Sequence, residues 1–340
     1  VVEKLIESAR LTKNHKYSVS RGILGLRNAI SEKYYRSYSV SLDPEKNIVN
    51  TIGSKEGLTH LMFSIINPGD KVIIPDPSYP IHQYAPLISR AKVKKVPLKD
   101  TNQFLESIEK ITLSEDIKLV LISFPHNPTT LTVDLDFYNK LVDLGQKRGF
   151  WIVNDFAYSD VYFDDKAPPS LLQAEGAIDN CVELYSLTKG YSMAGWRVGF
   201  AIGNEKAIGA LTKIKSYIDY GTFQPIQIAA ANALNRLDEY PKEVSSIYLE
   251  RREIVENVLQ ELRFDVQGSN ATMFVWAKIP DNINLGSIDF SIELLKNADV
   301  AVAPGLGFGD HGEGYVRIAL VENKNRIRQA MKNMKRMMDD

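Results

Sequence analysis

Lys189 lies in a stretch of residues whose types and spacing could carry covalent chemistry. An apolar run ends at the hydroxyl of Ser186, the lysine follows three residues later, and a second expected strand begins at Arg197. A lysine amine condenses with a carbonyl only when deprotonated, and burial between strands lowers its pKa. Ser186 and Arg197 could bind a phosphate dianion, the arginine through both prongs of its guanidinium. These groups suit a phosphorylated aldehyde; the competing interpretation is a surface lysine in a connecting loop.

Pyridoxal 5'-phosphate (PLP) is such an aldehyde, since a lysine supplies its Schiff base and its ring acts as an electron sink. Residues 186–199, SLTKGYSMAGWRVG, resemble the class I/II aminotransferase signature S-x-x-K-x-x-x-x-x-G-W-R-x-G at every fixed position. The resemblance runs from about residue 15 to the C-terminus. It is strongest toward bacterial glutamate–pyruvate (alanine) aminotransferases, with LL-diaminopimelate and aspartate aminotransferases as near relatives. It implies a fold-type I PLP-dependent transferase.

Composition and charge narrow the classes of partner. The 340 residues carry 41 basic and 42 acidic side chains, a formal charge of −1, so no polyanion such as nucleic acid is expected as a partner. The single cysteine, Cys181, lies in an apolar run and predicts a buried side chain and a reducing cytoplasm. No apolar stretch approaches the roughly 20 residues of a membrane span, and no signal peptide is recognised.

Short apolar runs alternate with helical patterns, which predicts an α/β fold with a mostly parallel sheet flanked by helices. A long amphipathic helix over 242–263 is expected to cross from a large PLP-binding domain, 1–245, into a small α+β domain, 246–340. The resemblance also implies an N-terminal segment carrying a glycine over the substrate, which we do not identify in this sequence. Expected strands of the large domain, seven in number, cover 48–52, 71–74, 93–97, 118–124, 150–154, 181–185 and 197–202; expected strands of the small domain cover 272–278 and 315–320.

Two turns after expected strands are candidates for cofactor contact. The first, around Gly53, opens a helix at Ser54, Lys55 and Glu56, whose backbone N–H groups would point at an anion. A plain strand-to-helix turn would look similar, but the resemblance places the cofactor phosphate here. The second turn, PDPSYP, carries Tyr79, whose ring the resemblance stacks on the pyridine; packing is the alternative.

Two further turns offer groups for the cofactor ring. Asn127 stands between prolines, and by resemblance it donates to the phenolic oxygen and lies beside the substrate, whereas His126 is expected to be an ordinary loop residue. Asp155 follows a strongly apolar strand, so it needs a cation, which a protonated pyridine nitrogen provides; an N-cap is the alternative. Ala157 is small enough for the ring to lie against it, and Tyr158 is expected to reach the phenolic oxygen opposite Asn127.

Arg317 interrupts an apolar strand near the C-terminus and so requires an anion. The resemblance assigns it the substrate α-carboxylate, and a protein carboxylate is the alternative. Tyr17 matches a segment that crosses the dimer interface in the family, which implies a homodimer with composite active sites. No arginine lies between Arg197 and Arg236, where many aspartate aminotransferases carry one, so Arg21 and Lys55 are the candidates for binding a distal carboxylate.

The sequence therefore predicts a ping-pong aminotransferase, with alanine as the favoured donor and 2-oxoglutarate as the acceptor. Lys189, Asp155 and Tyr158 are its expected catalytic residues. An aspartate, LL-diaminopimelate or aromatic/kynurenine aminotransferase is the alternative. A PLP lyase or racemase would share most of the site, and a regulator domain of the same fold would carry a DNA-binding extension, which is not found here. A dehydrogenase is disfavoured because no G-x-G-x-x-G follows the first strand.

Overall fold

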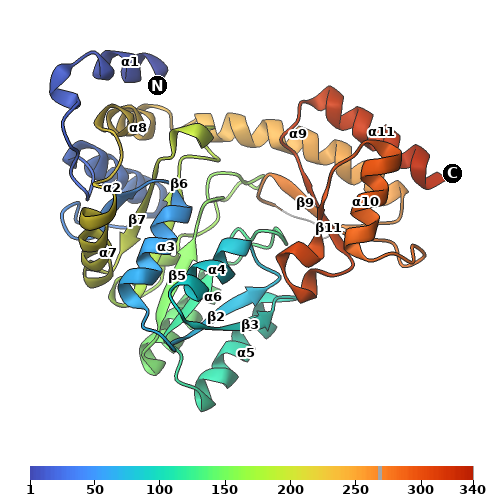
Figure 1. Ribbon diagram of the computed structural model, residues 1–340, viewed down its shortest axis with the longest axis horizontal. Coiled ribbons are helices and arrows are strands. Elements are labelled where there is room, and N and C mark those ends of the chain that lie inside the picture. Colours follow the sequence, from blue (N-terminus) through green and yellow to red (C-terminus); the bar gives the residue numbers. More distant parts are fainter. Residues whose placement is uncertain (267–269, 340) are drawn as a thin grey trace.

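Two sheets joined by one long helix organise the chain, as the computed structural model shows (Figure 1). The structure describes residues 1–266 and 270–339. The larger sheet has seven strands and the smaller has four, and α9 (Tyr240–Glu261) runs from one toward the other. The predicted domain boundary, between residues 245 and 246, falls inside this helix and stays a prediction.

The larger sheet is mostly parallel, as the sequence predicts. Its order is β1-β7-β6-β5-β4-β2-β3; the five strands from β6 to β3 run parallel, and β7 is antiparallel to both β6 and β1. The strands are β1 (Ile48–Thr51), β2 (Lys71–Asp76), β3 (Lys92–Pro97), β4 (Leu119–Ile122), β5 (Trp151–Asp155), β6 (Cys181–Ser186) and β7 (Gly199–Gly203).

Helices cover both faces of this sheet, because alternate side chains of each strand point to opposite sides. Along β2, for example, Val72 and Ile74 pack in one hydrophobic cluster and Ile73 in the other. Burying one such side chain fully contributes about 1.5–3 kcal/mol. Cluster members on the first face come from α3 (Ser54–Ile65), α4 (Pro80–Ile88) and α7 (Glu205–Ile218); those on the second come from α2 (Leu24–Tyr38), α5 (Thr101–Ser114), α6 (Leu135–Arg148) and α8 (Gln224–Arg236), against which α1 (Val2–Ala9) packs.

The smaller sheet is antiparallel and forms the predicted α+β unit. Its order is β10-β11-β9-β8, and its core includes Met331 and Met334, so the C-terminal methionines serve packing. The strands are β8 (Asp265–Val266), β9 (Phe274–Lys278), β10 (Ala303–Pro304) and β11 (Tyr315–Ala319); the helices are α9, α10 (Ser287–Ala298) and α11 (Lys324–Asp339). Short 3₁₀ turns are η1 (Thr12–Asn14), η2 (Leu171–Gln173), η3 (Ala177–Asp179), η4 (Ala194–Trp196), η5 (Gly305–Phe308) and η6 (Asp310–Gly312).

The prediction that a strand begins at Arg197 was wrong, because β7 begins two residues later. Arg197 has a left-handed backbone, with φ of +55°, at the end of η4. Gly199 is the first paired residue, and a Cβ there would lie 2.7 Å from the Tyr185 carbonyl oxygen and 2.9 Å from the Gly53 backbone. Close packing thus starts at the glycine, and the turn before it directs the Arg197 side chain back toward Gly53.

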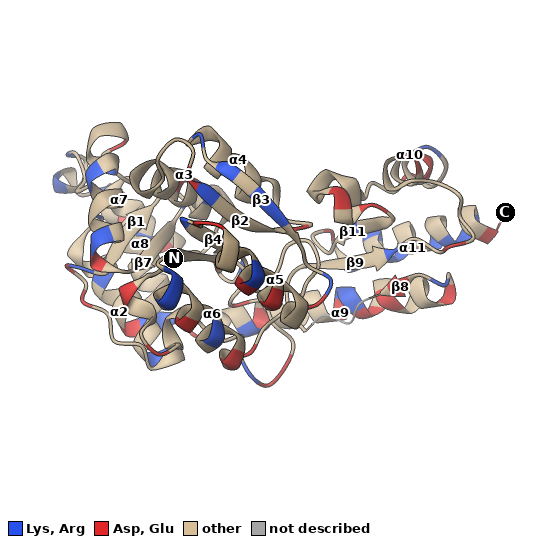
Figure 2. Cartoon of the chain, turned by 90° about the horizontal axis from the view of Figure 1, so that it is seen from below, with Lys and Arg blue, Asp and Glu red and all other residues tan. Residues whose placement is uncertain are grey.

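Basic and acidic side chains intermingle along the helices seen in Figure 2, in keeping with the near-zero formal charge. Among the helices of residues 1–266 and 270–339, none combines the length and the apolar character needed to cross a bilayer.

Candidate active site

A cavity of about 290 Å³ lies where β5 and β6 end, at the carboxyl edge of the parallel strands. Ligands of open α/β sheets bind at this edge. Its wall includes ten of the side chains singled out from the sequence, together with four others. The lining residues are Ser54, Lys55, Tyr79, Ile81, His82, Ser123, Asn127, Asp155, Ala157, Tyr158, Ser186, Thr188, Lys189 and Arg197.

Lys189 stands in the loop that follows β6, with its amine facing the cavity. The Ser186 hydroxyl donates to the Thr188 hydroxyl at 2.7 Å and accepts from the Thr188 N–H, which stiffens the start of this loop. The Lys189 Nζ lies 5.6 Å from the centre of the Tyr158 ring. Burial lowers the pKa of Lys189, and the positive charges of Arg317, Arg197 and Lys55 add to the effect, while Asp155 opposes it. The amine is therefore more readily available as a nucleophile than an ordinary lysine.

Asp155 ends β5 as a buried carboxylate with one oxygen bound and one available. Its Oδ2 lies 3.0 Å from Nε2 of His82, a fully buried histidine on α4. Its Oδ1 is buried and finds no hydrogen-bond partner among the described residues. A buried carboxylate oxygen without a donor is costly, so this position suits a ligand that carries an N–H or a positive charge.

His82 is a site residue that the sequence reasoning missed. It lies on α4, three positions after Tyr79, the N-cap residue of that helix, and both side chains border the cavity, with ring centres 5.9 Å apart. Residues three apart share one face of a helix, so a histidine placed three positions after a candidate ring was the available signal.

A chain of hydrogen bonds connects the two sheets through Asn127. Its side-chain nitrogen donates to the Tyr158 hydroxyl at 3.3 Å, and its Oδ1 accepts from Nη1 of Arg317, on β11, at 2.7 Å. The Arg317 guanidinium packs between the rings of Phe274 and Phe308, 5.0 and 4.6 Å from their centres, and its Nε is buried without a partner in the described part of the chain. Burial lowers the pKa of Arg317 and raises that of Tyr158. Arg317 is thus an arginine with donors left for an anion.

Tyr79 is held by a turn that touches the small domain. The Ser78 N–H donates to the Phe308 carbonyl at 2.8 Å, and Nδ1 of His311 lies 2.8 Å from Oδ2 of the buried Asp76. The Lys55 amine lies 5.3 Å from the centre of the Tyr79 ring. One wall of the cavity therefore combines the Tyr79 ring with the exposed Lys55 ammonium beside it.

The opposite end of the cavity gathers anion-binding groups around the start of α3. Gly53, with φ of +77°, leaves room for the Arg197 guanidinium, which a Cβ at this position would overlap. Ser54 is the first residue of α3, and the free N–H groups of a helix start favour an anion. Ser186 and Arg197 complete the group, and Arg197 donates to the Ala194 carbonyl at 3.1 Å.

Four predicted site residues do not border this cavity in their own chain. One of them, Arg317, contacts its wall through the hydrogen bond to Asn127. Glu56 directs its carboxylate toward Lys215 and the Ile52 N–H, away from the cavity. Tyr17 is 87% exposed and lies beside the Tyr220 ring. Arg21 is also absent from the lining.

The residues present fit PLP. A phosphate would meet Arg197, Ser186 and the start of α3, and the aldehyde carbon would meet Lys189. At the far end, the unpartnered Oδ1 of Asp155 suits a protonated ring nitrogen. Aromatic and small side chains, Tyr79 and Ala157, provide apolar surface for a flat ring.

Comparisons with known proteins agree with this geometry. Residues 1–333 match the family model described as aminotransferase class I and II. The chain is 44% identical over 341 residues to the glutamate-pyruvate aminotransferase AlaC of Escherichia coli, covering 99% of this chain and 82% of that protein. It is 44% identical over 324 residues to the LL-diaminopimelate aminotransferase of Natranaerobius thermophilus, covering 94% and 83%. The substrate-bound BacF structure from Bacillus subtilis superposes with a TM-score of 0.94 at 35% identity, covering 99% of this chain and 86% of that one.

Proposed function

Because the chain belongs to the aminotransferase class I and II family, and is therefore a PLP-dependent enzyme, we propose that it transfers the amino group of alanine to 2-oxoglutarate. The observation that carries this proposal is one cavity bordered by the Lys189 amine, the Asp155 carboxylate and the Arg197 guanidinium. The transfer takes place in two half-reactions of ping-pong type, so the keto acid product leaves before the acceptor binds.

PLP, when bound, supplies an aldehyde for amines and a ring that accepts the electron pair of a breaking Cα–H bond. The chain binds and orients this group. Arg197, Ser186 and the backbone N–H groups at Ser54, Lys55 and Glu56 hold the phosphate. Asp155 would keep a proton on the ring nitrogen, a role supported by its unpartnered Oδ1.

Lys189 has two tasks in this proposal. As a neutral amine it would hold the cofactor through its aldehyde, and as a free amine it would take the proton from the substrate Cα. The burial that lowers its pKa supports both tasks. Tyr158 and Asn127 would hold the phenolic oxygen of the ring, and their mutual hydrogen bond of 3.3 Å keeps the two side chains together. Tyr79 stacks on the ring.

Arg317 binds the α-carboxylate of each substrate, with Asn127 beside it. Its buried Nε without a partner in the described residues and its packing between two phenylalanine rings support this role. For the distal carboxylate of 2-oxoglutarate we favour Lys55 over Arg21, because only Lys55 borders the cavity of its own chain. Alanine has no distal carboxylate and fits without a second cation.

The assembly proposed for this enzyme is a homodimer in the cytoplasm. Tyr17, Tyr217 and Tyr220 are 87%, 80% and 54% exposed, and large exposed aromatic side chains gather at interfaces between subunits. In the dimer Tyr17 reaches the phosphate of the partner subunit, so each site is composite. The buried, unpaired Cys181 supports a reducing compartment.

A panel of amino donors, each assayed with 2-oxoglutarate, tests the function. We expect alanine to give the highest kcat/KM and aspartate a lower one, with glutamate as the product. LL-diaminopimelate is the second candidate, because the exposed Lys55 amine beside the cavity could receive a distal carboxylate. A preference for aspartate or LL-diaminopimelate would contradict the substrate proposal. Turnover of single amino acids without a keto acid would indicate a lyase or racemase, and no turnover at all would indicate a binding module.

A further inference from the structure

Lys215, on α7, is a fully buried cation outside the cavity. Its Nζ lies 2.9 Å from Oε1 of Glu56 and 3.0 and 3.2 Å from the two carboxylate oxygens of Asp219. A buried ammonium is stable only when carboxylates compensate for its lost hydration. The lysine is thus held between the first turn of α3, which carries Glu56, and the residue that follows α7.

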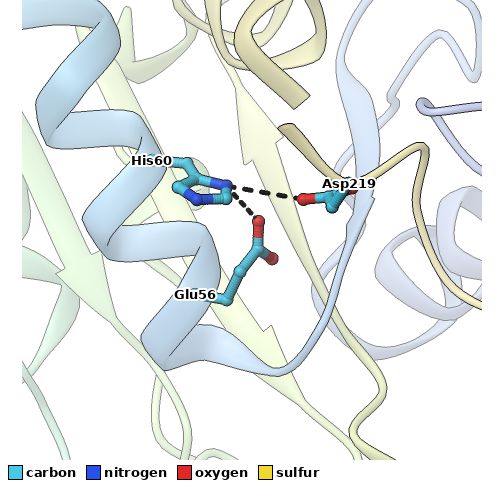
Figure 3. Close-up of side chains that lie close together, drawn as sticks. All are labelled: Glu56, His60 and Asp219. Atoms are coloured by element: carbon cyan, nitrogen blue, oxygen red, sulfur yellow. Dashed lines mark ion pairs between the residues drawn. The ribbon is translucent and has the colours of Figure 1, made fainter. Parts of the chain in front are cut away.

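His60 completes what we name the Lys215 cluster: Glu56, His60, Lys215 and Asp219. Its Nδ1 contacts the Glu56 carboxylate and lies 3.6 Å from Oδ2 of Asp219 (Figure 3). One histidine and two carboxylates would be suitable ligands for a metal ion. Lys215, however, already lies within hydrogen-bond distance of both carboxylates, so a metal ion on the same oxygens would meet a buried positive charge. The ammonium takes the place that a metal ion would otherwise fill.

The cluster is connected to the phosphate end of the cavity through Ile52. The second oxygen of Glu56, Oε2, accepts the Ile52 N–H at 2.7 Å. The Ile52 carbonyl in turn lies 3.5 Å from Nη2 of Arg197. Ser54 begins α3 two residues later. Fixing Glu56 therefore fixes the turn that presents the N–H groups of α3 and one of the contacts that orient Arg197.

We propose that the Lys215 cluster positions the phosphate-binding turn, and so sets how strongly the enzyme prefers PLP over the same aldehyde without phosphate. The proposal rests on the proposed placement of the phosphate beside Ser54 and Arg197. Lys215 and Glu56 are positioning residues, since neither borders the cavity. Without the ammonium, two neighbouring carboxylates repel each other, and Glu56 loses the partner that holds it against Ile52.

The test compares the affinities of the chain, stripped of cofactor, for PLP and for pyridoxal, followed by the absorbance of the bound aldehyde. We expect Lys215→Met to weaken the binding of PLP about tenfold or more, which is the scale of one charge-assisted hydrogen bond. The binding of pyridoxal should weaken less than about twofold. Glu56→Gln keeps an acceptor for Ile52 and is expected to show a smaller loss in the same direction. Lys213→Met, an exposed lysine on the same helix, is the matched control and leaves both affinities unchanged.

Three outcomes would overturn the proposal. The first is an equal loss for both ligands in Lys215→Met and Glu56→Gln, which would mean that the cluster only supports the fold. The second is an unchanged preference in both variants. The third is a wild-type chain that loses its preference for PLP on treatment with a chelator, which would make the cluster a metal site. Arg197→Gln separates these failures from a failure of the phosphate placement itself, because it must reduce the preference for PLP if that placement holds.

Discussion

Arg317 and Asn127, 190 positions apart in the chain, are joined by a hydrogen bond of 2.7 Å that connects the small sheet to the large one. The bond orients a guanidinium whose Nε remains buried and unpartnered among the described residues. An incoming carboxylate thus finds a donor whose direction is already set, which lowers the entropy that ordering would cost.

Arg317→Lys is expected to lower kcat/KM for alanine and for 2-oxoglutarate by roughly a hundredfold, because a lysine provides one point charge in place of a two-pronged fork. Cofactor content, measured by absorbance, should stay unchanged, since Arg317 is assigned to the substrate. Arg326→Lys, at an exposed position on α11, is the control. A loss of bound PLP in Arg317→Lys alone would reassign the residue to the cofactor.

Lys189→Ala is expected to retain PLP through the phosphate contacts while turnover falls by roughly 10⁴-fold or more, since both the amine and the proton carrier are removed. In the unmodified enzyme, borohydride reduction followed by peptide mass spectrometry should locate the cofactor on Lys189. A label on another lysine, or near-normal turnover in the variant, would exclude the assignment.

Asp155→Asn is expected to reduce kcat by at least about a hundredfold with little loss of bound cofactor, because a neutral amide no longer favours a protonated ring nitrogen. Rate and cofactor content are measured on the same preparation. Asp116→Asn, an exposed carboxylate, serves as control. If the variant lost PLP but kept its rate per bound cofactor, Asp155 would be an anchor only.

Lys55→Met is expected to raise the KM for 2-oxoglutarate about tenfold and leave that for alanine nearly unchanged, because only the former carries a distal carboxylate. Arg21→Ala tests the other cation in the same assay, and Lys206→Met, exposed at the start of α7, is the control. Equal losses toward both substrates in Lys55→Met would show that Lys55 serves the cofactor or the fold.

The buried His126 is expected to make the folded chain less stable as the pH falls. Burial and the nearby His82 lower its pKa to about 3, whereas an unfolded histidine titrates near 6.5. As pH falls between these values, the unfolded chain takes up a proton that the folded chain does not, so the free energy of unfolding decreases, by about 2 kcal/mol at pH 5.

His126→Asn, which can still bond Thr129, should therefore show a shallower fall in Tm between pH 7 and pH 5 than the unmodified chain, even if its Tm at pH 7 is lower. Exposed His15→Asn is the control. Parallel Tm curves for His126→Asn and the unmodified chain would mean that other groups dominate the acid response.

Much of this architecture could be predicted from local patterns. The central strands of the large sheet, β2, β4, β5 and β6, were recognised because buried parallel strands are short apolar runs, and Asp155 and Ser186 could be placed because each ends such a run. The family signature around Lys189 gave the cofactor, which is now shown by the family match.

Side-chain direction and long-range pairing could not be predicted in the same way. Glu56 follows Lys55 directly, yet one borders the cavity and the other pairs with Lys215, 159 positions away. The left-handed turn at Arg197 depends on the closeness of Gly199 to Tyr185 and Gly53, a contact that no local pattern contains. His82 acquired its role through a bond to Asp155, 73 positions away.

Because α9 joins the two sheets, the residues assigned to the cofactor and the arginine assigned to the substrate α-carboxylate lie on different segments of the chain. The residues assigned to the cofactor within one subunit lie between Gly53 and Arg197 on the large sheet and its loops, whereas Arg317 and the two phenylalanines that hold it belong to the segment after α9. Substitutions in the later segment therefore change how the α-carboxylate is held, whereas the cofactor contacts and Lys55, the cation proposed for a distal carboxylate, are inherited with the large sheet. The same cofactor-binding segment can thus be combined, during evolution, with altered substrate-binding segments.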